Sequence, residues 1–255
     1  MTENALPHVS DSQVKHAKMR ARARIISLIG NELVSDEPVA VVELVKNAYD
    51  ADASKVTVEF SGKDPADPDT LTVKDDGIGM DVDTVLRGWF EPGSANKLQC
   101  DRSPGGRLYQ GAKGIGRFAA ARLATSMSME TKQSGQSNGV SVLLDWGKFG
   151  EDNYLDEVEL LYEVRPMLSM DHGTELTLAG MHSRKHWTAD DFRQLHNRLS
   201  RLISPFQEKD GGDRSLDFKV DLVVPGYPEL TGTVLPDPVT RQPKYKIAGR
   251  LDTQG

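Results

Sequence analysis

Apolar and polar residues alternate along several short stretches of the chain, and each alternation predicts a half-buried strand. The pattern is sharpest over 55–60, where Val56, Val58 and Phe60 alternate with polar residues. A loop rich in Gly, Pro and Asp at 61–69 separates this stretch from a second strand at 70–74. Further strands are expected at 125–132, 139–146, 156–165, 174–179, 215–224 and 243–250.

Between and before these strands lie stretches in which apolar residues have the spacing of a helix. Pro38 suits the first turn of one helix, and Thr188 with Asp191 three residues later forms a capping pair for another. The expected helices are 12–29, 36–50, 81–88, 111–124 and one that begins after Thr188. The order of helix, strand, helix and then a run of strands predicts an α+β fold, with helices on one face of a mixed sheet.

The expected domain organisation has three parts. Residues 1–12 are expected to form a flexible arm and residues 13–212 the main domain. Inside that domain, 91–112 is rich in Gly and Pro, which predicts a flexible loop. The strands expected within 213–255 follow the domain, and the chain stops at LDTQG without a closing element. We therefore expect a piece of a longer protein in which 213–255 begins another domain.

Composition excludes several classes of protein. The chain has 255 residues, of which 38% are hydrophobic and 27% charged, as in ordinary soluble proteins. The net charge of −7 argues against a protein that coats nucleic acid. One cysteine, Cys100, allows neither an internal disulfide nor a cysteine-based zinc site. No apolar run reaches the roughly 18 residues of a membrane span, and no signal core is present, so we expect a cytoplasmic protein without a membrane partner.

The first stretch with possible chemistry is EPVAVVELVKNAYDADA. On a helix, Glu43, Asn47 and Asp50 share one face, while apolar residues cover much of the rest. Such a polar stripe must be hydrated or must face a ligand, because burying it without partners costs a few kcal/mol. The pattern alone leaves both interpretations open.

The second stretch, LTVKDDGIGMD, runs from a strand into closely spaced glycines. Gly77 and Gly79 allow a sharp turn and a close approach of a ligand to the backbone. Asp76 could accept a hydrogen bond from an exocyclic amine, and Met80 offers a soft apolar surface for a ring. A simple turn at the end of a strand also explains the pattern. The alternating acids of a calcium loop are absent.

The third stretch, GAKGIGRFAA, places Gly111, Gly114 and Gly116 before a helix. Free backbone N–H groups at a helix N-terminus can bind an anion. The spacing fits neither a P-loop, because Ala112 stands where the lysine is needed, nor a Rossmann loop, because no strand precedes it directly. Seven basic and two acidic residues between Arg87 and Arg122 favour an anion, although a hydrated basic loop is equally consistent.

The order and spacing of the three stretches resemble the GHKL ATPases, which include gyrase B, heat-shock chaperones, histidine kinases and MutL-type mismatch-repair proteins. The pattern is E-x-x-x-N-x-x-D-A, a strand, D-x-G-I-G-M, a loop, and G-x-x-G-x-G-x-x-x-A. His172-Gly173-Thr174 before the strand TELTL is similar to the family's Gly-Thr segment. The resemblance covers residues 13–205 and implies a Bergerat-type two-layer α+β sandwich with a mostly antiparallel sheet.

The resemblance implies roles for the helical motif and the glycine-rich loop. Glu43 resembles the general base that activates the attacking water, and Asn47 the ligand of the Mg²⁺ that bridges the phosphates. Asp50 is implied to be a structural partner beside the site, and residues 91–112 a lid over ATP. The backbone amides implied to cradle the terminal phosphates are those of Lys113, Gly114, Ile115, Gly116 and Arg117.

The resemblance also implies an adenine site. Asp76 is expected to accept a hydrogen bond from the adenine amino group, directly and through a water held with Thr174. Gly79 and Met80 are expected to line the adenine slot. ATP and Mg²⁺ are therefore the expected ligands.

ELVKNAYDADASKV is most similar to the MutL, MORC and chaperone-like branches. These branches imply slow ATP hydrolysis, lid closure, an ATP-dependent homodimer, and a DNA or protein client bound through regions beyond this chain. Two other functions stay open: a nucleotide-binding regulatory module with negligible turnover, and a histidine-kinase-like phosphotransferase. For the latter, the sequence QVKHAKMRAR around His16 does not resemble the phosphoacceptor segment of that class.

Overall fold

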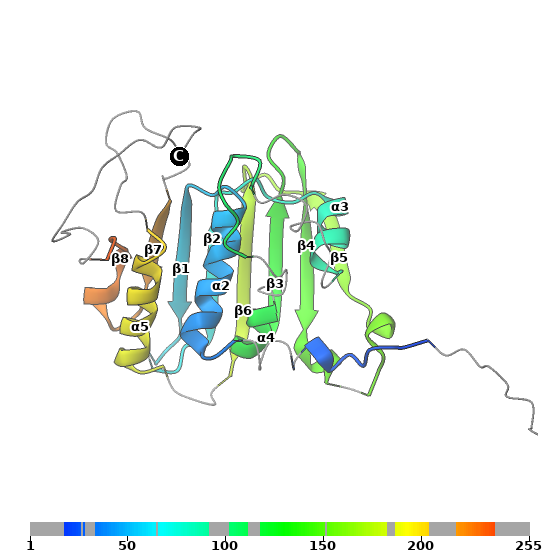
Figure 1. The fold of residues 1–255 in the computed structure, drawn as a ribbon, viewed down its shortest axis with the longest axis horizontal. Coiled ribbons are helices and arrows are strands. Elements are labelled where there is room, and N and C mark those ends of the chain that lie inside the picture. Colours follow the sequence, from blue (N-terminus) through cyan, green and yellow to red (C-terminus); the bar gives the residue numbers. More distant parts are fainter. Residues whose placement is uncertain are drawn as a thin grey trace, which may run out of the picture.

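One sheet and three helices dominate the structure, a computed structural model (Figure 1). It describes residues 18–26, 28, 34–64, 66–91, 102–111, 118–150, 152–182, 187–203 and 218–237. The strands are β1 (Lys55–Ser61), β2 (Thr70–Asp75), β3 (Ala124–Lys132), β4 (Asn138–Asp145), β5 (Leu161–Pro166), β6 (Gly173–Met181), β7 (Lys219–Val223) and β8 (Gly232–Thr233). The helices α2 (Glu37–Asp50), α4 (Ala119–Leu123) and α5 (Ala189–Ser200) lie across one face of the sheet.

The order across the sheet is β5-β4-β3-β6-β2-β1-β7-β8. Among these described strands, β1 and β7 run parallel and every other neighbouring pair is antiparallel. This confirms the predicted α+β sandwich with a mixed, mostly antiparallel sheet. Both β7 and β8 lie in the predicted C-terminal part, and they continue the same sheet. The predicted boundary at 212/213 lies outside the described residues.

Helix α2 is the central helix of the covering layer, and it begins as the sequence predicts. The Asp36 side chain accepts a hydrogen bond from the Val39 N–H at 2.8 Å, and Pro38 lies in the first turn. Val41 and Val45 are fully buried in the core. Each such side chain contributes roughly 1.5–3 kcal/mol on burial, so α2 is held by packing as well as by its cap.

No helix in the described ranges is both long and apolar enough to cross a bilayer.

Several element boundaries differ from the sequence prediction. The helix expected at 81–88 is a single turn, α3 (Val82–Thr84), followed by a π-helical turn, η1 (Val85–Trp89). The strand expected at 156–165 begins late, because Leu155–Glu157 forms a 3-10 turn before β5. Residues 18–22 of the helix expected at 12–29 are not helical, and Arg22 forms an antiparallel bridge with Tyr154. The strand expected at 243–250 lies outside the described residues.

Candidate functional site

A cavity of about 300 Å³ lies between α2, the end of β2, the start of β6 and the turn from α3 to Trp89. Most of its lining is apolar. The polar residues in the lining are Asn47, Asp50, Asp75, Thr84, Tyr109 and Thr174. A concave, mainly apolar cavity with a few convergent polar groups is typical of a small-molecule site.

Two of the three polar residues predicted on one face of α2 line this cavity. Asn47 and Asp50 are in the lining, whereas Glu43, one helical turn earlier, is not. The half-buried Glu43 accepts a hydrogen bond on Oε1 from Lys46 Nζ at 2.7 Å. The predicted polar stripe is therefore divided: Asn47 and Asp50 line the cavity, whereas Glu43 forms an ion pair with Lys46.

Asp50 connects α2 to the segment that precedes the glycine-rich loop. Its buried carboxylate accepts hydrogen bonds from the backbone N–H groups of Gln110 and Gly111, at 2.7 and 3.1 Å. Asp50 thus holds the segment before the glycine-rich loop against the C-terminal end of α2. The loop residues expected to hold phosphate, Lys113, Gly114, Ile115, Gly116 and Arg117, lie outside the described residues.

Asp75 is the carboxylate at the end of β2 that lines the cavity. It is partly buried, and its Oδ1 accepts a hydrogen bond from the Gly77 N–H at 2.9 Å. Burial raises the pKa of Asp75 to about 6, while hydrogen bonds from the Gly77 and Thr174 backbone act in the opposite direction. The carboxylate is therefore mostly ionised at neutral pH, and it offers an acceptor inside a mainly apolar cavity.

Asp76 does not face the cavity, so the predicted placement of its carboxylate is wrong. Oδ1 accepts hydrogen bonds from the Ser54 and Lys55 backbone N–H groups, at 2.8 and 2.7 Å, and Oδ2 accepts one from Ser54 Oγ at 2.5 Å. Partial burial works against ionisation, but these hydrogen bonds outweigh it and lower the pKa of Asp76. The side chain caps the start of β1, and its acceptors are already used.

Gly79, Met80 and Thr174 line the cavity as predicted. Gly79 has a φ of 65°, and a Cβ there would overlap the carbonyl of Lys132, so only glycine fits. The buried Thr131 hydroxyl accepts a hydrogen bond from the Met80 N–H and lies 3.0 Å from the Thr174 hydroxyl. The turn after β2 is thereby held against β3 and β6.

The sequence of this chain matches a known protein family. The family described as "Histidine kinase-, DNA gyrase B-, and HSP90-like ATPase" matches residues 35–188, more than half of the chain. The chain belongs to this ATPase family. The match confirms the predicted resemblance.

Individual relatives are more distant. The chaperone protein HtpG of Shewanella pealeana is 28% identical over 242 residues, covering 87% of this chain and 34% of the relative. HtpG of Halalkalibacterium halodurans is 24% identical over 202 residues, covering 72% of this chain and 30% of the relative. The DNA mismatch repair protein MutL of Thermoanaerobacter sp. (strain X514) is 31% identical over 134 residues, covering 50% and 20%. The chain spans about a third or less of the length of these relatives.

Part of the predicted lid of this ATPase-family domain has a defined structure. Asp52 accepts hydrogen bonds from Ser103 Oγ and from the Gly105 N–H. The buried Arg107 donates to the backbone carbonyls of Tyr49 and Ala53, at 3.3 and 2.6 Å. We call residues 102–111 the clasp. It is fastened to the C-terminal end of α2, and it places Tyr109 in the cavity lining.

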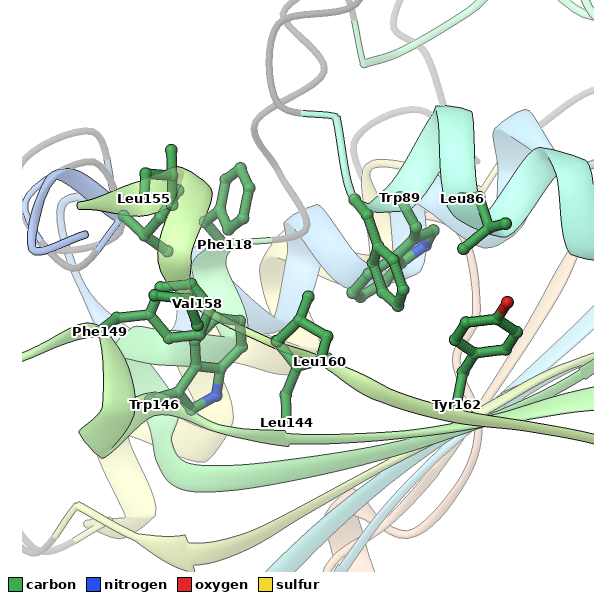
Figure 2. A pocket seen from close by; sticks show the side chains of 12 residues that line it. Leu86, Trp89, Phe118, Leu144, Trp146, Phe149, Leu155, Val158, Leu160 and Tyr162 are labelled. Atoms are coloured by element: carbon green, nitrogen blue, oxygen red, sulfur yellow. The ribbon is translucent and has the colours of Figure 1, made fainter. Parts of the chain in front are cut away.

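A second, mostly apolar cavity of about 230 Å³ lies beside the first (Figure 2). Trp89 lines both cavities, so the turn η1 forms part of the wall of each. Figure 2 shows Trp89 and Leu86 on one side, Phe118 and Leu155 on the other, and Leu160 below them.

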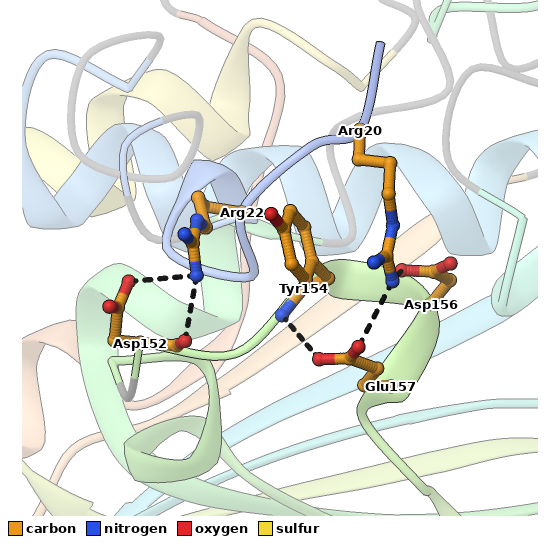
Figure 3. Close-up of polar contacts among 6 residues, drawn as sticks. All are labelled: Arg20, Arg22, Asp152, Tyr154, Asp156 and Glu157. Carbon is orange, nitrogen blue, oxygen red and sulfur yellow. Dashed lines mark hydrogen bonds and ion pairs between the residues drawn. The ribbon is translucent and has the colours of Figure 1, made fainter. Parts of the chain in front are cut away.

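The N-terminal segment is fastened beside the second cavity by charged contacts (Figure 3). Arg20 pairs with Asp156 and Glu157, and its guanidinium lies 3.6 Å from the centre of the Tyr154 ring. Arg22 pairs with Asp152 and lies over the same ring. The segment that follows contributes Ile26 to the second cavity.

The first cavity includes residues that are not predicted as site residues from the sequence, among them Asp75, Trp89 and Tyr109. Asp75 carries a usable signal, because it is two and four residues after the apolar Val73 and Leu71 and so shares their face of the strand. Trp89 and Tyr109 carry no such signal, since the π-helical turn and the clasp depend on tertiary contacts. No group of three or more His, Cys, Asp or Glu side chains in the described ranges could hold a metal ion.

Proposed function

We propose that this domain binds Mg²⁺-ATP in the cytoplasm, hydrolyses it slowly, and closes its lid and dimerises when ATP is bound. The observation that carries the proposal is Asp75, an ionised acceptor in a mainly apolar cavity of an ATPase-family domain. Adenine presents an amino group that needs an acceptor and flat faces that suit apolar side chains such as Met80 and Leu176. We therefore assign the adenine contact to Asp75, with Thr174 beside it.

The residues in the cavity fit a magnesium ion that is held mainly by phosphate. Mg²⁺ prefers oxygen ligands, keeps several waters, and usually takes only one or two ligands from the protein. The Asn47 carbonyl oxygen is suited to be such a ligand, because Asn47 lines the cavity on α2. The ion, when bound, would neutralise charge on the phosphates. The amides of the glycine-rich loop at 113–117 are expected to hold the terminal phosphates.

We assign the role of general base to Glu43. It lies on α2 one helical turn before Asn47, which lines the cavity, and its carboxylate is the group that we assign to take a proton from the attacking water. In the structure this carboxylate is paired with Lys46. Lys46 holds one of the two carboxylate oxygens, which restricts the ways in which a water can approach Glu43, and this favours slow turnover.

The same ion pair favours a second candidate, a regulatory module that binds ATP with negligible hydrolysis. Lys46 Nζ holds Oε1 of the Glu43 carboxylate at 2.7 Å, so that oxygen is taken by the protein and not by an attacking water while the pair is formed. The two candidates share the ATP site and differ only in turnover. Phosphate release separates them.

The decisive experiment measures phosphate release and nucleotide affinity for the 255-residue chain and two variants. Glu43→Ala should keep its affinity for a non-hydrolysable ATP analogue and lose roughly 10²–10⁴-fold in turnover, the usual contribution of a positioned base. Lys46→Ala is the matched control, because it breaks the same ion pair without removing the base. We expect this control to retain or increase turnover.

Each outcome has a distinct meaning. Equal background rates in the chain and in Glu43→Ala, with a melting temperature that ATP still raises, would support the regulatory module. Label transferred from γ-labelled ATP to the protein would support a phosphotransferase. Turnover that rises more than linearly with protein concentration would support ATP-dependent dimerisation. Failure to bind ATP at all would overturn the proposal.

The names of the relatives point to two classes, a protein for a chaperone and DNA for a mismatch repair protein. We propose that one of these classes is bound through regions that this chain does not span.

A further inference from the structure

Strand β5 is an edge of the sheet, because among the described strands β4 alone pairs with it (Figure 1). Three of its apolar side chains are exposed to solvent: Leu161 is 66% exposed, Tyr162 46% and Val164 45%. An edge strand with exposed apolar side chains can pair with another strand, because its outward backbone groups have no partner in the sheet.

The direction of the backbone groups in β5 follows from its end. The Met167 N–H donates to the Ser137 carbonyl, at 3.4 Å, on the side of β4. Backbone groups alternate along an antiparallel strand, so those of residues 161, 163 and 165 also face β4. The N–H and C=O groups of Tyr162 and Val164 then face outward. Pro166 occupies the next outward position, where its missing N–H is tolerated.

The side chains of β5 divide into an apolar row, with Tyr162 and Val164, and a row on the other face in which Leu161 precedes the charged Glu163 and Arg165. Val164 and Tyr162 lie opposite the buried Val140 and Val142 of β4, which places them on the face that carries the helices. On the opposite face, Glu163 and Arg165 follow one another at two-residue spacing, and Arg165 pairs with Glu130 and Glu163. The edge thus carries two residues of opposite charge on either side of Val164.

We propose that β5 pairs with β5 of a second copy of this chain, antiparallel, about a twofold axis at Val164. In this register Val164 faces the partner's Val164, and their outward N–H and C=O groups bond reciprocally. Tyr162 lies opposite the partner's Pro166 and donates its N–H to that residue's carbonyl. The apolar row packs on itself on the helix-covered face. A self-complementary patch of this kind is what a twofold interface requires.

Charge selects this register. With the axis at Val164, Glu163 lies opposite the partner's Arg165, and Arg165 opposite the partner's Glu163. Moving the axis to Glu163 keeps the hydrogen-bonding pattern but sets Glu163 against the partner's Glu163. Like charges placed directly opposite one another destabilise a strand pair, whereas opposite charges stabilise it by roughly 0.2–1 kcal/mol. Charged residues and proline can also protect an edge from pairing, which is the contrary prediction that the experiment tests.

The experiment is sedimentation equilibrium of the 255-residue chain without nucleotide. A contact along one short strand is small, so we expect a dimer with a Kd on the order of 100 µM. Glu163→Arg or Arg165→Glu turns both symmetric charge pairs from attractive to repulsive, and each should raise the Kd about tenfold. The double variant restores opposite charges and should return the Kd to within about threefold of the original.

Two further variants complete the test. Glu175→Arg is the matched control: Glu175 pairs with Lys74 on a central strand at 2.8 Å, and its reversal should leave the Kd unchanged. Val164→Pro removes an outward N–H at a position where an edge strand tolerates proline, and it should weaken the dimer while the monomer stays folded.

Three results would overturn the proposal: a chain that stays monomeric up to about 1 mM, charge reversals with no effect on the dimer, or a double variant as weak as the single ones. The inference does not depend on ATP. Its failure would leave the proposed ATP site untouched, and loss of ATP binding would leave this dimer contact untouched.

Discussion

Two regions of the molecule meet where β2 ends: the wall of the first cavity, which contains Asp75, and the start of β1, which Asp76 caps. Burial raises the pKa of Asp75 to about 6. Asp76 lies nearer to solvent; desolvation works against its ionisation, but hydrogen bonds from Ser54 and Lys55 outweigh it and lower the pKa of Asp76. Two neighbouring residues of the same type therefore lie in opposite electrostatic environments.

The difference indicates which carboxylate is available to a ligand. Asp76 has both oxygens occupied by donors of the protein, so its negative charge stabilises the fold. For Asp75, the hydrogen bonds from the backbone do not fully offset the cost of burying its charge, so a further donor from a ligand would stabilise the ionised carboxylate. A carboxylate in a cavity whose ionised form is destabilised by burial is a better candidate for ligand binding than one whose oxygens already accept hydrogen bonds from the backbone.

The largest expected effect is on nucleotide affinity. Asp75→Asn should weaken ATP binding about 30- to 100-fold, because a hydrogen bond to a charged acceptor contributes roughly 1.5–3 kcal/mol and the amide also presents a donor to the adenine amine. Calorimetry with a non-hydrolysable analogue measures it. Asp76→Asn is the matched control and should change the affinity less than threefold. A loss in the control that equals the loss in Asp75→Asn would contradict the distinction between the two residues.

The second effect is on stability, and its sign depends on pH. The folded state retains the Asp75 proton up to about pH 6, whereas the unfolded chain releases it near 3.8. The stability that protonation confers is therefore complete below pH 3.8 and is lost as the pH rises through 6. Asp75→Asn should raise the free energy of unfolding by about 2 kcal/mol at pH 7.5, and by much less at pH 4.

Urea unfolding of both proteins at each pH measures this difference. His172 and Asp76 also act on the Asp75 carboxyl, so the comparison is made between two proteins at one pH and not across pH values in one protein. A variant that is less stable than the original chain at pH 7.5 would show that the Asp75 carboxylate is satisfied in the apo protein.

The third effect is the converse, at Asp76. Asp76→Ala should lower the free energy of unfolding by about 1 kcal/mol, because the N–H groups of Ser54 and Lys55 lose their acceptor and must be hydrated instead. Asp76→Asn retains an oxygen for both N–H groups and should lose less. Both variants should bind ATP normally once folded. A larger loss in ATP affinity than in stability would place Asp76 at the ligand after all.

The overall architecture could be predicted because it depends on local periods. The two-residue alternation of Val56, Val58 and Phe60 and the Asp36 cap of α2 both give the expected elements. The same alternation in β2 favours Asp75 over Asp76, because Leu71 and Val73 are buried on the side that Asp75 shares. The carboxylate that lines the cavity is therefore one residue earlier in the chain than the predicted Asp76.

Other features of the cavity could not be predicted, because they depend on contacts between distant residues. Tyr109 reaches the lining because contacts with distant residues hold the clasp, among them the bond from the Gln110 N–H to Asp50, sixty positions earlier in the chain. Trp89 depends on a π-helical turn, for which single-sequence patterns give no signal. Strand β5 begins late because Leu155–Glu157 forms a turn before it. Arg22 of the N-terminal segment forms a bridge with Tyr154, directly before this turn.

The smallest expected effect extends the comparison to Asp52, which resembles Asp76 because it holds backbone and hydroxyl donors instead of facing the cavity. Asp52→Asn preserves the left-handed backbone, φ 59°, but removes one acceptor of the clasp. Losing about 1 kcal/mol of docking should speed tryptic cleavage after Arg107 about fivefold, with a smaller loss of ATP affinity than in Asp75→Asn. Asp64→Asn, in a turn with Ala66, is the control and should not alter this cleavage. Unchanged cleavage in Asp52→Asn would mean that Asp50 and Arg107 hold the clasp without it, so that the acceptor which Asp52 provides is redundant there.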